Sequence, residues 1–301
     1  MMPHTTDLQF SLFLPQMRFS MDALVERARA AEAAGFTGIA LMDHLAPPMA
    51  ESQPMYDAMT TAAWLAASTS TLRVGHLVLC DAMRHPAVLA KEAITLDHAT
   101  GGRFELGIGW GSVPAELERF GVGDTSPKQR VRRLAETLEV VGALWSGEVV
   151  DFDGEFHTLR QAQQAPLPQG HIPIVIGGTG PATMRLVARH ADWWNLPLSA
   201  LDKLDDRRAD AGNARVSLQV MVALVPDEPS RAAVTEQATR RFGAYGDGLV
   251  IGTAPELVER FAGLADRGVD RLYVWFADFA PSSTLAAFGH DVVGPLTGAR
   301  P

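Results

Sequence analysis

The feature that most constrains the fold is a regular alternation of short apolar segments with longer amphipathic ones. The apolar segments have strand length, and the first of them is typical of a strand buried on both faces. The amphipathic segments carry apolar residues at helical spacing. Strands that alternate with helices pair in parallel. The segments expected to be strands are Gln9–Pro15, Gly38–His44, Arg73–Cys80, Phe104–Trp110, Ile172–Gly178, Asp192–Leu196, Ser217–Val225 and Arg271–Phe276.

The expected helices lie between these strands, and the first of them stops at Gly35, a residue typical of helix C-termini. One further segment, Val149–Leu159, alternates around Asp153-Gly154 and predicts a β-hairpin between the fourth helix and the fifth strand. The expected helices are Asp22–Ala34, Tyr56–Ser70, His85–Ala99, Lys128–Trp145, Pro181–His190, Ala200–Ala214, Ser230–Phe242 and Pro255–Arg267.

Eight strands alternating with helices fit two α/β layouts, a closed (β/α)8 (TIM) barrel and a doubly wound open sheet. The open sheet would place a phosphate-binding glycine turn directly after the first strand, and Phe13-Leu14-Pro15-Gln16 is not such a turn. Length is compatible with one barrel of about 250 residues plus excursions. We therefore predict a single TIM-barrel domain over residues 1–301, with the small hairpin as an excursion.

Charge and composition exclude several classes of protein. The net charge is −9, from 26 basic and 35 acidic residues, with no basic stripe, so we expect no nucleic-acid partner. The longest apolar runs, such as Phe10–Pro15, are too short to cross a membrane. Met1–Gln16 lacks the pattern of a secretion signal, so we expect a cytoplasmic protein. The single cysteine and the absence of HxH or HExxH predict neither a disulfide nor a metal site.

In a TIM barrel the active site lies at the C-terminal ends of the strands. The second strand ends at Asp43-His44, and histidine is the side chain that exchanges protons near neutral pH. The alternative interpretation is a helix-capping aspartate beside a hydrogen-bonded histidine. We nevertheless take this pair as the first candidate for chemistry.

Two glycine clusters also fall at strand ends. Gly177-Gly178-Thr179-Gly180 lies between a strand and a helix, where free backbone amides attract phosphate; the alternative is a simple tight turn. Gly107, Gly109 and Gly111 run along a strand and out of its end. This second pattern indicates a flat group close to the backbone or, alternatively, close packing of the barrel without a ligand.

Together these features indicate a large planar ligand with a phosphate tail. Trp110 and Trp194 lie at strand ends, from which an indole can stack on a ring.

Four stretches of the chain resemble the luciferase-like flavin and deazaflavin oxidoreductases, a superfamily of eight-stranded barrels that includes bacterial luciferase and the coenzyme F420-dependent dehydrogenases and reductases. The resemblance extends from Phe10 to about Phe276, and the second stretch is the most specific. The stretches are AAGFTGIALMDHL at Ala33–Leu45, RHPAVLAKEAITLDHATGGRFELGIGWG at Arg84–Gly111, IPIVIGGTGPATMRLVARHADWWN at Ile172–Asn195 and LVERFAGLADRGVDRLYVWF at Leu257–Phe276.

The resemblance implies roles for individual residues. It implies that Asp43 contacts the coenzyme and that His44 is the catalytic acid or base, handling the substrate proton or tuning the reduced ring. It also implies a non-proline cis peptide at Leu77-Val78, or one bond later, against the middle of the coenzyme ring. The predicted coenzyme-binding residues are Asp43, Leu77, Val78, Cys80, Gly109, Trp110, Gly111, Ser112, Gly177, Gly178, Thr179 and Gly180, the last four meeting the phosphate.

The chain departs from one branch of the superfamily. Where the F420-dependent sugar-phosphate dehydrogenases carry a catalytic glutamate after the strand-four glycines, this chain has Ser112. Lysine is also scarce, which argues against a phosphorylated sugar as substrate. The loops near Met49–Tyr56 and after Asn195 are expected to line the substrate pocket, and their Met, Tyr, Leu and Pro residues favour an apolar substrate.

The resemblance implies an oxidoreductase that transfers a hydride between coenzyme F420 and an organic substrate, which the loop residues indicate is small and apolar. Members of the superfamily are commonly dimers, so we expect a homodimer. Two alternatives remain open. One is an FMN-dependent monooxygenase that uses molecular oxygen. The other is a barrel that binds a flavin without catalysis.

Overall fold

A computed structural model describes residues 7–298 of the chain except 49, 51, 124 and 125. Strands form where the apolar segments of the sequence lie, because both faces of a parallel sheet are covered in this kind of fold. The strands are β1 Gln9–Phe13, β2 Gly38–Leu41, β3 Arg73–His76, β4 Leu79–Cys80, β5 Leu106–Gly109, β6 Val150–Asp153, β7 Thr158–Ala162, β8 Ile174–Gly177, β9 Trp193–Pro197, β10 Arg215–Leu224, β11 Leu249–Gly252 and β12 Arg271–Phe276.

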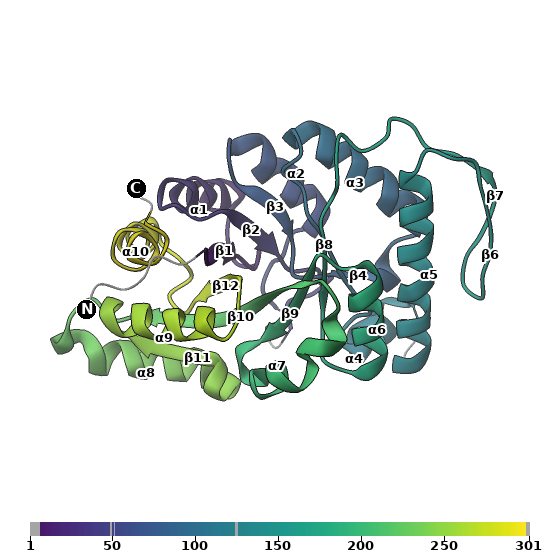
Figure 1. The fold of residues 1–301 in the computed structure, drawn as a ribbon. Helices are drawn as coiled ribbons and strands as arrows, with labels where there is room; N and C mark the ends of the chain where they lie inside the picture. The colour runs from purple at the N-terminus through teal and green to yellow at the C-terminus, as the bar shows by residue number, and fades with distance from the viewer. Residues whose placement is uncertain (1–6, 49, 51, 124–125, 299–301) are drawn as a thin grey trace.

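The main sheet is a parallel barrel (Figure 1). Its hydrogen-bonded order is β3-β2-β1-β12-β10-β9-β8-β5-β4. The expected third strand, Arg73–Cys80, is divided into β3 and β4 by a cis peptide bond between Leu77 and Val78. β3 and β4 lie at the two ends of this order, and both belong to the expected third strand. Val74 of β3 also bridges in parallel to Phe104, just before β5, so the sheet closes into a barrel. The prediction of an eight-stranded barrel is confirmed.

Helices connect consecutive barrel strands and cover the outside of the barrel (Figure 1). Several begin at capped positions: Ser20 accepts the Ala23 amide of α1, and Thr253 with Glu256 forms a capping box on α9. No helix within the described ranges is both long and apolar enough to cross a membrane. The helices are α1 Met21–Ala33, α2 Ala58–Ser68, α3 Pro86–Thr100, α4 Pro114–Phe120, α5 Pro127–Trp145, α6 Pro181–His190, α7 Asp202–Arg207, α8 Arg231–Phe242, α9 Ala254–Asp266, α10 Ser282–Phe288 and α11 Gly294–Thr297.

The structure differs from the sequence prediction in four places. The expected helix Ala200–Ala214 is broken into α7 and flanking 3-10 turns, since its residues are mostly polar and offer little apolar surface to bury. Four helices or strands were not predicted: α4, after the fourth barrel strand; β11, which pairs with the C-terminal half of β10; and α10 and α11, which follow the last barrel strand. Strands β6 and β7 form a separate antiparallel pair that extends beside α5 (Figure 1).

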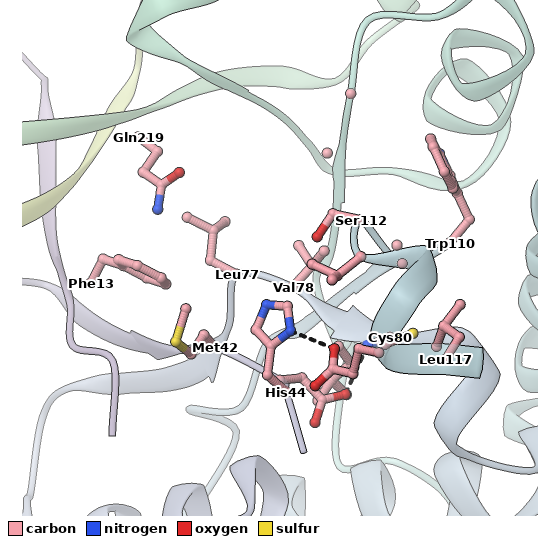
Figure 2. Close-up of a pocket in the computed structure, with 18 residues that line it drawn as sticks. Phe13, Met42, His44, Leu77, Val78, Cys80, Trp110, Ser112, Leu117 and Gln219 are labelled. Carbon is pink, nitrogen blue, oxygen red and sulfur yellow. Dashed lines mark hydrogen bonds and ion pairs between the residues drawn. The ribbon is translucent and has the colours of Figure 1, made fainter. Parts of the chain in front are cut away.

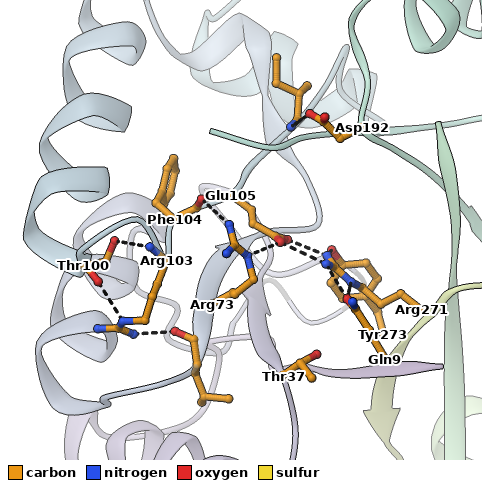
Figure 3. Close-up of polar contacts among 12 residues, drawn as sticks. Gln9, Thr37, Arg73, Thr100, Arg103, Phe104, Glu105, Asp192, Arg271 and Tyr273 are labelled. Carbon is orange, nitrogen blue, oxygen red and sulfur yellow. Dashed lines mark hydrogen bonds and ion pairs between the residues drawn. The ribbon is translucent and has the colours of Figure 1, made fainter. Parts of the chain in front are cut away.

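The N-terminal end of the barrel contains a buried network of charged side chains (Figure 3). Glu105 precedes β5, and its carboxylate accepts from Arg271 at 2.6 and 3.1 Å and from Arg73 at 2.6 Å. Arg271 also donates to Gln9 and to the Tyr273 hydroxyl. Burial alone would raise the pKa of Glu105, but Arg271 and Arg73 hold it below its ordinary value. This network supports the barrel at the end opposite the C-terminal ends of the strands.

His76, the last residue of β3, is buried near the start of α2, with 1% of its surface exposed. Burial lowers its pKa from 6.5 to about 4, while the neighbouring charges of Asp43 and Asp57 oppose that shift and Arg84 adds to it. The unfolded chain therefore binds more protons at this residue between pH 6.5 and pH 4 than the folded chain does. The contribution of His76 to the free energy of unfolding is expected to decrease by about 3 kcal/mol as the pH falls through this window.

The test compares urea denaturation of the wild type and of His76→Phe at several pH values between 7 and 4. Phenylalanine retains a ring against Phe104, whose ring lies 6.1 Å from that of His76. Burial raises the pKa of Asp81 to about 6, which has the opposite effect on stability over much of the same range. The relevant quantity is therefore the difference between the two proteins. A difference that does not change with pH would contradict the prediction.

Candidate functional site

A cavity of about 380 Å³ opens at the C-terminal ends of the barrel strands (Figure 2). Its volume lies in the range of about 300–1,000 Å³ that is typical of small-molecule sites. It brings together the predicted site residues of strands two to five, except Thr179 and Gly180. The lining residues are Phe13, Met42, Asp43, His44, Leu77, Val78, Leu79, Cys80, Gly109, Trp110, Gly111, Ser112, Val113, Glu116, Leu117, Gly177, Gly178 and Gln219.

His44 is held in one orientation by Glu116, a residue of α4 that sequence reasoning missed. The Nδ1 atom of His44 lies 2.7 Å from Oε2 of Glu116 (Figure 2). The other carboxylate oxygen accepts the Leu45 and Ala46 amides at 2.6 and 3.1 Å. An ionised carboxylate only accepts hydrogen bonds, so Nδ1 carries the proton and Nε2 is left as the group that faces the cavity.

Glu116 was not predicted as a site residue because α4 spans only seven residues, too few to show helical periodicity in the sequence. The available signal was its position: Glu116 is four residues beyond Ser112 and lies in the first turn of the helix that begins at Pro114. Ser112 itself lines the cavity.

Asp43 connects the end of β2 to β4. Its carboxylate accepts from Arg84 at 2.6 and 3.1 Å and from the Cys80 backbone amide at 2.8 Å. These contacts fix the segment that follows the cis bond, Leu79–Cys80, against the cavity. Burial raises the pKa of the Cys80 thiol to about 11, so Cys80 stays a neutral thiol at pH 7.

The glycines of the fourth barrel strand make room for the third strand. A Cβ atom on Gly107 would collide with the His76 carbonyl oxygen, and one on Gly109 would lie 2.8 Å from a methyl group of Val78. At Gly111 a Cβ atom would lie 2.9 Å from Sγ of Cys80. Of the two interpretations of this pattern, close packing of the barrel accounts for all three positions. The glycines thereby allow Val78 and Cys80 to form the back wall of the cavity.

The other glycine cluster is divided between the cavity and α6. Gly177 and Gly178 line the cavity, and Gly178 has a φ of 126°, which favours glycine. Gly180 is the N-cap of α6, and a Cβ atom there would meet open space. The helix N-terminus thus lies just beyond the cavity lining, with Thr179 between them.

The two tryptophans singled out from the sequence differ in role. Trp194 is wholly buried and donates to the Gly178 carbonyl at 2.7 Å, so the expectation that it can stack on a ligand is wrong. Trp110 lines the cavity, and the Arg130 guanidinium lies 4.8 Å from its ring centre. Arg130 also donates to the Gly111 carbonyl at 3.0 Å, which secures the loop after β5.

The loops expected to line the substrate pocket do not supply the cavity lining. Within the loop near Met49–Tyr56, Met49 and Glu51 lie outside the described residues, and the described members are absent from the lining. The segment after Asn195 is absent from it as well. The apolar lining comes instead from Phe13, Met42, Leu77, Val78, Leu79, Trp110, Val113 and Leu117.

Residues 5–242 match the family described as luciferase-like monooxygenase. The chain belongs to this family. An F420-dependent glucose-6-phosphate dehydrogenase of Microbacterium testaceum is 30% identical over 74% of this chain and 70% of its own length. Several other curated relatives are matched over only about half of their length.

Solved structures share the fold of this luciferase-like protein. An F420-dependent secondary alcohol dehydrogenase, in complex with an F420-acetone adduct, superposes with a TM-score of 0.81 at 18% identity, over 97% of this chain and 99% of its own. The monooxygenase RslO1 of Streptomyces bottropensis has a TM-score of 0.80 at 21% identity, over 95% and 99% of the two chains. A dehydrogenase and a monooxygenase therefore share this architecture.

Proposed function

We propose that this protein is an oxidoreductase that transfers a hydride between coenzyme F420 and a small apolar organic substrate. The observation that carries the proposal is the His44–Glu116 pair, which presents Nε2 of His44 to a cavity at the C-terminal end of the barrel. The relative with F420-dependent glucose-6-phosphate dehydrogenase activity in its name supports the choice of coenzyme.

The cavity residues fit a deazaflavin with a phosphorylated tail. Leu77 and Val78 offer an apolar ridge against which a planar ring can lie. Gly177 and Gly178 lead to the N-terminus of α6, where backbone amides and the helix dipole favour a phosphate. When bound, the deazaflavin supplies the carbon that accepts or donates the hydride.

Within this proposal His44 handles the proton that accompanies the hydride. Nε2 takes a proton from a substrate hydroxyl, or returns one to a substrate carbonyl oxygen. Glu116 holds the proton on Nδ1 and stabilises the imidazolium form with its negative charge. Phe13, Met42 and Leu77 exclude water from the substrate side of the cavity.

The deciding experiment titrates the purified protein separately with F420 and with FMN, under argon and in air, while absorbance and fluorescence are recorded. We expect saturable F420 binding, much weaker FMN binding and no oxygen consumption with reduced F420. Tight FMN binding with oxygen consumption by the reduced flavin would instead favour a monooxygenase. F420 binding without turnover of any neutral alcohol or ketone would favour a non-catalytic barrel.

We also propose that the protein is a homodimer. The outward residues of α2 support this: Thr60, Ala63, Trp64 and Ala67 follow helical spacing, are exposed and carry no charge. Trp64 is 54% exposed, which is unusual for a side chain of this size. A molar mass near 32.4 kDa by light scattering, the mass of one chain, would contradict the proposal.

A further inference from the structure

The Gln219 side chain is a polar group in the cavity that the described residues leave without a partner. It lies on β10, where Val216, Leu218 and Val220 belong to the hydrophobic core and Ser217 and Gln219 alternate with them. The cavity lining includes Gln219, and no hydrogen bond joins its amide to any part of the chain that the structure describes. The side chain of Gln219 is half-buried, and its amide offers two donors and an acceptor to a molecule in the cavity.

The surroundings of Gln219 define what could bind there. Phe13, Met42 and Leu77 belong to one apolar cluster inside the barrel mouth. Figure 2 shows the Gln219 amide pointing toward the side of the cavity where Phe13 and Leu77 lie. A ligand held there packs its hydrocarbon part against these side chains and has one neutral hydrogen-bonding group in reach.

The charged groups of the lining favour a neutral ligand. The ionisable acids and bases that line the cavity are Asp43, His44 and Glu116, together with the thiol of Cys80. Asp43 is already paired with Arg84, and Glu116 with His44. A phosphate group placed here would lie near two carboxylates, and the described lining offers no further fixed cation to pair with it.

We propose that Gln219 is a specificity-determining residue that binds the hydroxyl or carbonyl group of a compact neutral substrate, whose hydrocarbon part packs on Phe13, Met42 and Leu77. The inference rests on the proposed function, because the substrate considered is the hydride donor or acceptor. The inference names the residue that selects the substrate. It also predicts that this chain binds a neutral molecule in preference to a sugar phosphate.

The test measures ligand binding by calorimetry, with and without saturating F420. The three probes are cyclohexanone, methylenecyclohexane and glucose 6-phosphate. In methylenecyclohexane a CH₂ group replaces the ketone oxygen of cyclohexanone. The wild type is expected to bind cyclohexanone about tenfold more tightly than methylenecyclohexane, the size of one neutral hydrogen bond. Gln219→Leu is expected to reduce this preference to less than about threefold, with F420 affinity unchanged. Gln237→Leu, at an exposed glutamine of α8, is the matched control.

Three results would overturn the inference. They are an unchanged preference in Gln219→Leu, no measurable binding of cyclohexanone, and tighter binding of glucose 6-phosphate than of cyclohexanone. If F420 itself does not bind, the proposed function fails, while the arm without F420 still tests Gln219. Should Gln219→Leu not fold, as judged by circular dichroism, Gln219→Met replaces it with an unbranched side chain.

Discussion

Replacing His44 with alanine is expected to lower the turnover number by roughly 10²–10⁴-fold, the range typical of a lost acid–base group. The reason is that Nε2 of His44 is the proton-exchanging atom that Glu116 orients toward the cavity. The dissociation constant for F420 is expected to change by less than about threefold, because cofactor binding relies on other contacts along the cavity. Steady-state kinetics with reduced or oxidised F420, together with fluorescence titration, separates the two effects.

Two further variants show whether the histidine acts as proposed. Glu116→Gln keeps a hydrogen-bonding group near Nδ1 but removes the charge, so turnover is expected to fall less than in His44→Ala. His290→Ala changes a solvent-exposed histidine in the C-terminal segment and serves as the control. Unchanged turnover in His44→Ala would show that the catalytic role of His44 is wrong.

Replacing Glu105 with glutamine is expected to lower the free energy of unfolding by about 3–5 kcal/mol, as when one partner of a buried ion pair is removed. The substitution preserves shape but leaves Arg271, whose side chain is 4% exposed, without its counter-charge. Arg73 loses the same partner. Urea denaturation at pH 7 measures the effect through the shift of the transition midpoint.

The control for this prediction is an exposed ion pair. Asp153 and Arg160 lie 3.1 Å apart on the β6–β7 hairpin, with 77% and 59% of their side chains exposed. Asp153→Asn is therefore expected to change stability by less than about 1 kcal/mol. If Glu105→Gln were equally mild, the network at the N-terminal end of the barrel would not be the support that its burial indicates.

The barrel could be predicted because each strand is apolar enough to be recognised without its neighbours. For example, β8 at Ile174–Gly177 lies within the segment expected from the sequence, and β12 at Arg271–Phe276 matches its segment. Strand β11 was missed because it has only four residues, follows a glycine-rich turn and pairs with the C-terminal half of β10. Helix α4 was missed for the same reason of length, and with it the glutamate on which the orientation of His44 depends.

Site positions were easier to predict than the partners of each side chain. The positions of the strand ends predicted that Asp43 and His44 lie at the cavity, because the strands of a parallel barrel all end on one face. Their contacts with Arg84 and Glu116 depend on loops and helix starts that no periodicity encodes. Gln219 was missed because it lies within a strand, where an isolated polar residue gives no signal of the cavity it faces.

The close packing of the β5 glycines against the third barrel strand also limits which substitutions this side of the cavity accepts. A methyl group added at Gly109 needs the space that Val78 now fills, so enlarging one position requires trimming the other. A substitution at Gly109 alone meets this clash, whereas paired substitutions of Gly109 and Val78 can avoid it. Reshaping the cavity for other ligands is thus a two-site design problem, and variation at the two positions across related chains should be correlated.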